Sequence, residues 1–137
     1  RLKKSAQKAG VDCEFKLFSR QELLEVLHGA DLYVHTALVE IEAIACMEAI
    51  AGGLVPVICN SERSATRYFA LDERNLFKKN DAQDLAAKID FWYDNESLRN
   101  EYTQKYRALR DSFSQKVCME QMEQMLLNAI EEHKKVS

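Results

Sequence analysis

Excess basic charge, long apolar runs and paired cysteine motifs are all missing from this sequence. The formal net charge is -3, so the chain lacks the basic surface that nucleic-acid binding requires, and we expect no nucleic-acid partner. No apolar run approaches the roughly 20 residues of a membrane span, and the N-terminus has no signal-peptide pattern. The cysteines show no CxxC spacing, which favours free, reduced thiols at Cys13, Cys46, Cys59 and Cys118.

Two common kinds of catalytic centre are missing as well. No histidine, cysteine and aspartate residues cluster at metal-ligand spacing, so we expect no metal site. No Ser-His-Asp arrangement is apparent. The sequence also lacks repeats, low-complexity tracts and linkers, and its 137 residues, 47% of them hydrophobic, fit a single domain over 1–137. Because the chain opens directly in a helix-like run over 2–9, we expect it to be part of a longer protein.

Strand-like and helix-like segments alternate through the first half of the chain. Ser19 and Glu22 have the spacing of a capping box, which marks the start of a helix. The only proline, Pro56, lies inside a strand-like run, so that strand is expected at a sheet edge or to begin with the proline. The alternation indicates an α/β fold, a Rossmann-like parallel sheet flanked by helices. The predicted strands cover 13–18, 31–36 and 54–59, and the predicted helices between them cover about 20–28 and 43–51.

The second half is mostly helical. We expect a short turn or helix at 64–70, a brief strand at 76–77, and helices near 81–94, 96–111 and 114–134. The C-terminal helical tail, residues 112–137, carries an apolar stripe at helical spacing that favours core or interdomain packing. The stripe comprises Cys118, Met122, Met125 and Ala129.

Two glutamates bracket the predicted start of a helix near Ala43. In an open parallel sheet, ligands bind beyond the carboxyl ends of the strands, and residues 36–44 hold that position. A helix N-terminus there offers unpaired N–H groups to a phosphate, while Glu40 and Glu48 are acceptors suited to sugar hydroxyls. This combination favours a sugar nucleotide. Surface helices routinely carry glutamates, however, so an ordinary solvated helix face is the alternative.

The wider pattern around these glutamates resembles a known family. "GADLYVH", then Glu40-x7-Glu48, then "EAIAGGLVPVI" (48–58) resemble the C-terminal domain of retaining glycosyltransferases of family 4, which have the GT-B architecture. The resemblance extends through "DAQDLAAKI" (81–89) and "SFSQ" (112–115) and covers about 15–130. Within the family, the sequence is most similar to bacterial lipid glucosyltransferases, a subgroup that includes sterol α-glucosyltransferases.

The resemblance implies roles for individual residues. It implies that Glu48 binds the ribose hydroxyls of the nucleotide and that Glu40, the candidate catalytic residue, contacts the donor hexose. The main-chain N–H groups of the next residues would face the diphosphate or hexose, and the loop after the first strand would lie near the base. These further donor-binding positions are Glu42, Ala43, Ile44, Phe18 and Ser19.

The sequence departs from the family pattern between the glutamates. The family usually shows Gly-Phe-Gly there, whereas this chain has Ile41-Glu42-Ala43. Ala43 is small enough to replace a glycine, but Glu42 adds negative charge beside a diphosphate and should point away. The usual Gly-Gly after the third strand is replaced by "ERSAT" (62–66). His35, at a strand end near the site, is expected to be structural more often than ligand-binding.

The resemblance also sets expectations for the whole protein. It implies a UDP-sugar donor, expected to be UDP-glucose, no metal cofactor, and a lipid, sterol or polysaccharide-precursor acceptor. An N-terminal acceptor-binding domain and the first strand of this domain would precede Arg1, so the chain alone should be inactive. We expect a cytoplasmic protein, peripheral to the inner face of the membrane through that domain. Two alternatives are a non-catalytic Rossmann-like module and a sugar-nucleotide epimerase of the same architecture.

Overall fold

The computed structural model describes residues 2–136. Its longer elements confirm the predicted helices, and the short 3₁₀ segments fall in the connections. The helices are α1 (Leu2–Ala9), α2 (Arg20–Gly29), α3 (Ile44–Ala51), α4 (Ala82–Asp94), α5 (Glu96–Arg110) and α6 (Gln115–Val136). The strands are β1 (Leu32–His35), β2 (Val55–Asn60) and β3 (Leu76–Lys78), and the 3₁₀ segments are η1 (Ala65–Phe69), η2 (Glu73–Asn75) and η3 (Asp111–Phe113).

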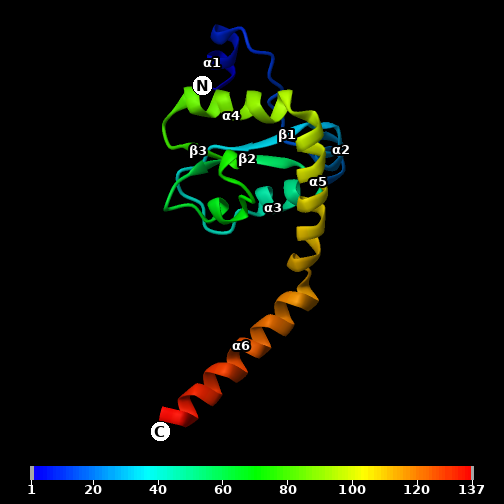
Figure 1. The fold of residues 1–137 in the computed structure, drawn as a ribbon. Helices are drawn as coiled ribbons and strands as arrows, with labels where there is room; N and C mark the ends of the chain where they lie inside the picture. The colour runs from blue at the N-terminus through cyan, green and yellow to red at the C-terminus, as the bar shows by residue number, and fades with distance from the viewer. Residues whose placement is uncertain (1, 137) are drawn as a thin grey trace.

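The strands form a three-stranded sheet in the order β1-β2-β3. Both pairings are parallel, with Leu32 opposite Val55 and Ile58 opposite Leu76. Helix α4 lies on one side of this sheet and α3 on the other, while α5 runs across its end (Figure 1). The predicted α/β class, a parallel sheet flanked by helices, is therefore confirmed.

Pro56 corrects one expectation, because β2 is the central strand and Pro56 is its second residue. The N–H and C=O of one strand residue point to the same side of the strand. The carbonyl of Pro56 accepts a hydrogen bond from Asn75 Nδ2 at 2.8 Å, on the side where the β3 ladder begins only at Ile58. An N–H at residue 56 would point to this same side, where no strand among the described residues is paired with β2 at that position. The lack of an N–H in proline therefore costs no hydrogen bond of the sheet.

The strand predicted over 13–18 is wrong. Residues 11–19 have no regular secondary structure and connect α1 to α2 (Figure 1). The apolar side chain of Leu17 is 97% exposed. A strand needs a neighbour for its backbone groups, and in the described residues β1 pairs only with β2.

The core lies between the sheet and the helices that cover it. Val55, Val57 and Ile58 of β2 are fully buried together with Trp92 of α4 and Tyr106 of α5. Trp92 Nε1 donates to the carbonyl of Arg74 at 3.0 Å, so its polar edge is satisfied inside the core. Tyr93, the next residue, is 62% exposed, because one face of α4 cannot bury the whole run Phe91-Trp92-Tyr93.

Helix α6 also differs from expectation, because it extends away from the rest of the molecule (Figure 1). Met122 and Met125 are 51% and 61% exposed, and Cys118 is exposed too. Core packing of this stripe is therefore wrong for the described residues, while interdomain packing stays a prediction. Among residues 2–136, no helix is long and apolar enough to span a bilayer.

Candidate donor site

The loop that joins β1 to α3 is tied by its backbone to the loop that follows β2. Glu40 forms an isolated parallel bridge with Ser64: its N–H donates to the carbonyl of Arg63 at 3.2 Å, and its carbonyl accepts from the N–H of Ala65 at 2.9 Å. Ser61 Oγ adds a bond of 2.6 Å to the carbonyl of Leu38. The "ERSAT" segment therefore fixes the position of the Glu40 backbone.

Helix α3 begins with an unusual backbone conformation. Its N-cap, Ala43, has φ 57° and ψ 34°, the left-handed region, and makes no capping hydrogen bond through its side chain. Glycine adopts this conformation without strain, which explains physically why a glycine suits this position in the family pattern. The side chain of Ala43 is buried, so alanine fits. The first N–H groups of α3 lack carbonyl partners within the helix.

The Glu40 side chain is held on one side by the main chain. Its Oε1 accepts a hydrogen bond from the N–H of Ile41 at 2.9 Å. Its Oε2 lies 3.9 Å from Nε2 of His35, and the side chain is 33% exposed. One carboxylate oxygen is therefore bound locally, while the other faces the end of β1.

His35 connects this carboxylate to Tyr33. The Tyr33 hydroxyl lies 3.0 Å from His35 Nδ1. Burial lowers the pKa of His35, and the negative charge of Glu40 acts in the opposite direction. Burial, followed by the neighbouring charges of Cys46, Glu40 and Glu48, raises the pKa of Tyr33 to about 12. At neutral pH the phenol therefore keeps its proton.

Glu48 lies on the α2 side of α3. It is exposed and lines a recess of about 240 Å³ between the two helices. The α2 residues in this recess include Arg20, which follows the predicted base contact Ser19 directly, and the leucines of that helix. The recess thus places Glu48 close to the start of α2.

The structure groups the predicted residues in two sets. Four positions, Glu40, Glu42, Ala43 and Ile44, follow one another along the loop into α3. Glu42 is exposed, and its orientation away from a diphosphate stays a prediction. Glu48 lies farther along α3 and faces α2. The negative charges of both acids contribute to the raised pKa of Tyr33, after burial and Cys46.

Phe18 and Ser19 do not follow a strand, so the structural reason for placing them beside a base is lost. Ser19 is instead the N-cap of α2: its Oγ accepts from the N–H of Glu22, and its own N–H donates to Glu22 Oε2 at 2.8 Å. The predicted capping box is confirmed. The donor-binding roles of both residues stay predictions.

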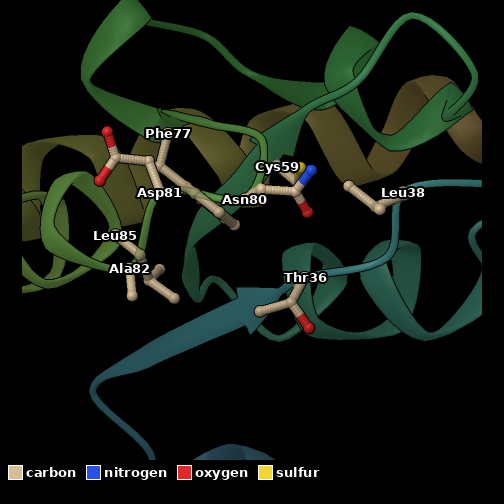
Figure 2. Close-up of a pocket in the computed structure, with 8 residues that line it drawn as sticks. All are labelled: Thr36, Leu38, Cys59, Phe77, Asn80, Asp81, Ala82 and Leu85. Carbon is tan, nitrogen blue, oxygen red and sulfur yellow. The ribbon is translucent and has the colours of Figure 1, made fainter.

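A second recess of about 320 Å³ lies beyond the carboxyl ends of the strands. Figure 2 shows its side chains around the end of β1, with Thr36 and Leu38 on one side and Asn80 and Asp81 on the other. None of the predicted donor-binding residues lines it. The Asp81 carboxylate caps α4 by accepting from the N–H groups of Gln83 and Asp84, so we assign this recess no donor contact.

Reasoning from the sequence did not single out Tyr33, and the expectation that His35 is structural rather than ligand-binding stays a prediction. Residues at positions i and i+2 of a strand share one face, and this spacing in "DLYVH" was the available signal. It did not show that the pair would end beside Glu40. Among residues 2–136, no three His, Cys, Asp or Glu side chains are grouped so as to hold a metal ion.

Known proteins similar to this chain show which fold and which family it has. A crystal structure of the catalytic domain of cholesterol-alpha-glucosyltransferase from Helicobacter pylori matches with a TM-score of 0.79 and 52% sequence identity, over 82% of this chain and 71% of that chain. The fold is therefore that of a GT-B glycosyltransferase domain. The family model for glycosyl transferases group 1 matches residues 1–109, and the chain belongs to this family. No curated protein matches.

Proposed function

We propose that this domain binds the donor in an enzyme that transfers glucose from UDP-glucose, with retention of configuration, to a lipid or sterol acceptor. The observation that carries the proposal is the placement of Glu40 in the loop that leads into the N-terminus of α3 and of Glu48 within that helix. The similar solved structure is that of a cholesterol-alpha-glucosyltransferase, which supports glucose as the sugar and a sterol as the acceptor.

In this proposal the start of α3 binds the diphosphate. The free N–H groups after Ala43 and the positive end of the helix dipole favour an anion there. Glu40 accepts hydrogen bonds from the hexose, and Glu48 accepts them from the ribose, on the side toward α2. The domain contributes position and electrostatic stabilisation of the leaving diphosphate, and a further domain supplies the acceptor. We also propose that transfer needs no metal ion and takes place at the cytoplasmic face of a membrane.

The surroundings of Glu40 support an apolar acceptor. The loop and the start of α3 expose four large apolar side chains, and exposed apolar groups of this kind often mark ligand or partner contacts. They are Leu38, Val39, Ile41 and Ile44.

Calorimetric titration of UDP-glucose into the full-length enzyme tests the site. A charge-assisted hydrogen bond contributes roughly 1.5 to 3 kcal/mol, so Glu48→Ala should weaken donor affinity by about one to two orders of magnitude. Glu123→Ala, a change at an exposed glutamate of α6, is the matched control and should bind as the parent does. Parental affinity in Glu48→Ala would show that the ribose assignment is wrong.

Glu40 has a different expected signature. Glu40→Ala should lower turnover with UDP-glucose while leaving affinity for UDP, which has no hexose, close to that of the parent. An equal loss of affinity for both ligands would contradict a hexose contact. Release of UDP that depends on added sterol or lipid would favour the transferase over an epimerase of the same architecture, and release that persists with EDTA would support metal-free transfer.

A further inference from the structure

The side chains of Tyr33 and His35 form a short chain of polar groups that ends at Glu40. Both residues belong to β1, and their rings lie on the same side of the strand with centroids 6.0 Å apart. The Tyr33 hydroxyl and His35 Nδ1 are 3.0 Å apart, within hydrogen-bond distance. Because the pKa of Tyr33 is raised, the hydroxyl is protonated at neutral pH and can donate to Nδ1.

That hydrogen bond determines where the imidazole carries its own hydrogen. A neutral imidazole has one N–H and one acceptor nitrogen, so when Nδ1 accepts from Tyr33 the hydrogen is on Nε2. The His35 side chain is only 11% exposed, and Nε2 is a buried atom with no hydrogen-bond partner in the described residues. Its charged neighbour is Glu40 Oε2 at 3.9 Å.

The arrangement leaves a donor and an acceptor facing each other just beyond hydrogen-bond distance. A buried polar atom without a partner is costly, and one that persists next to a functional site calls for an explanation. Glu40 Oε1 is already bound by the N–H of Ile41, so a small rotation of the carboxylate toward His35 would satisfy Nε2 as well. Both oxygens would then be fixed, one by the main chain and one by the imidazole.

We propose that Tyr33 and His35 position the Glu40 carboxylate for its contact with the donor hexose. Tyr33 selects the imidazole tautomer with hydrogen on Nε2, and His35 uses that hydrogen to orient Glu40. Neither residue touches the substrate in this scheme, so both are positioning residues. The inference rests on the proposed function, because it gives His35 a role only through Glu40.

A double-mutant cycle with the full-length enzyme tests this coupling. Tyr33→Phe removes one hydroxyl and should lower kcat by roughly tenfold, with the KM for donor within about twofold of the parent value. In a Glu40→Ala background the same change should lower kcat by less than about twofold, because the group on which it acts is gone. Tyr93→Phe, at a tyrosine that is 62% exposed on α4, is the matched control and should leave kcat unchanged.

The outcomes separate this inference from the proposed function. If Glu40→Ala lowers kcat but Tyr33→Phe acts equally in both backgrounds or not at all, the positioning role is overturned and the donor site stands. If Glu40→Ala leaves kcat unchanged, the proposed role of Glu40 fails, and the positioning role fails with it.

A spectroscopic measurement gives a readout besides activity. Nitrogen-15 NMR of the His35 ring should show hydrogen on Nε2 in the parent and a shifted tautomer population in Tyr33→Phe. Because the negative charge of Glu40 raises the pKa of His35, Glu40→Gln should lower it. A neutral His35 ring with its hydrogen on Nδ1 in the parent would overturn the proposal. So would a His35 pKa that is the same in Glu40→Gln as in the parent. His35→Gln, which keeps a donor near the position of Nε2, should retain more turnover than His35→Met.

Discussion

At the scale of single residues, backbone geometry shapes the candidate site together with its acids. Ala43 holds a left-handed conformation immediately before α3, and an L-residue in this conformation loses roughly 1 to 2 kcal/mol relative to the right-handed form. The conformation turns the chain so that Glu40 remains bridged to Ser64 while α3 starts only a few residues later. A strained residue beside candidate ligand contacts is a common property of functional sites.

This geometry predicts a large difference between two identical substitutions. Ala43→Val should lower the free energy of unfolding by at least about 2 kcal/mol, since a β-branched residue is a poor fit to φ 57° and the buried position has little room. Ala45→Val, two residues on and exposed in the first turn of α3, should cost only about 0.5 kcal/mol. Urea unfolding followed by circular dichroism measures both; equal losses would contradict strain at residue 43.

Candidate site residues can be found from the sequence when the pattern that marks them is local, but not when it depends on long-range contacts. The spacing of Glu40 and Glu48 is local, so the sequence alone could single out both as candidates, and their roles stay predictions. The partnership of Tyr33 and His35 with Glu40 depends on where the loop after β1 returns, and that path is set by hydrogen bonds to Arg63 and Ala65. Long-range backbone pairing of this kind leaves no local pattern to read.

At the scale of elements, helices were predictable and strands less so. Helices carry their own hydrogen bonds, and their caps are local: Ser19 with Glu22 marks α2, and Asp81 marks α4. A strand depends on a neighbour. The segment over 13–18 has strand-like composition but no partner among residues 2–136, and it is irregular. The expectation for Pro56 was wrong for the same reason. A central strand can hold a proline there only because the β3 pairing begins farther along, at Ile58.

Helix α2 should depend strongly on its cap. None of its residues is fully buried, so packing adds little to its stability. Ser19→Ala removes the side-chain acceptor for the Glu22 N–H and should destabilise the helix by about 1 kcal/mol. Hydrogen exchange measured by mass spectrometry should show faster exchange in α2 with little change in β2. Ser97→Ala, at an exposed position in the first turn of α5, is the control; unchanged α2 protection in Ser19→Ala would contradict a role for the cap.

At the scale of the whole molecule, one polar cluster joins the second half of the chain together. Asp72 accepts from Arg74 Nε and Nη2, both at 2.6 Å, and from the Tyr102 hydroxyl at 2.8 Å. Arg74 also lies over the ring of Trp92, 5.7 Å from its centroid. The cluster links η2 to α4 and α5, whose aromatic residues form part of the core.

This cluster predicts how stability changes with pH. The pKa of Asp72 lies well below its usual value of 3.8, mainly because Arg74 donates hydrogen bonds to the carboxylate. A carboxyl with a depressed pKa in the folded state stabilises the fold above its unfolded-state pKa, and this contribution is lost as the pH falls. We therefore expect a loss of roughly 1 to 3 kcal/mol below about pH 4.

Asp72→Asn tests this expectation by chemical denaturation at several pH values. The variant should be less stable than the parent near pH 7, and the difference should shrink as the pH falls below about 4. Asp90→Asn, at an exposed aspartate of α4, controls for loss of one negative charge. A difference between Asp72→Asn and the parent that stays constant down to about pH 2 would contradict an ionised, hydrogen-bonded Asp72.

Helix α6 is the part of the molecule least supported by the rest. It packs chiefly against η3 at its start, and several of its apolar side chains, including Met125 and Leu126, are more than half exposed. Isolated helices are marginally stable in water unless an apolar face is covered. In dilute solution we therefore expect the amides of α6 beyond its first turns to exchange nearly as fast as in an unfolded chain.

Hydrogen exchange followed by mass spectrometry checks this expectation, with α5 as the internal control. Helix α5 buries Tyr102 and Tyr106 and packs against α3, so its amides should remain protected when those of α6 exchange. Protection in α6 that rises with protein concentration would mean that a second copy covers the apolar stripe. Protection in α6 equal to that of α5 at the lowest concentration would contradict the expectation, because nothing described in this chain would account for it.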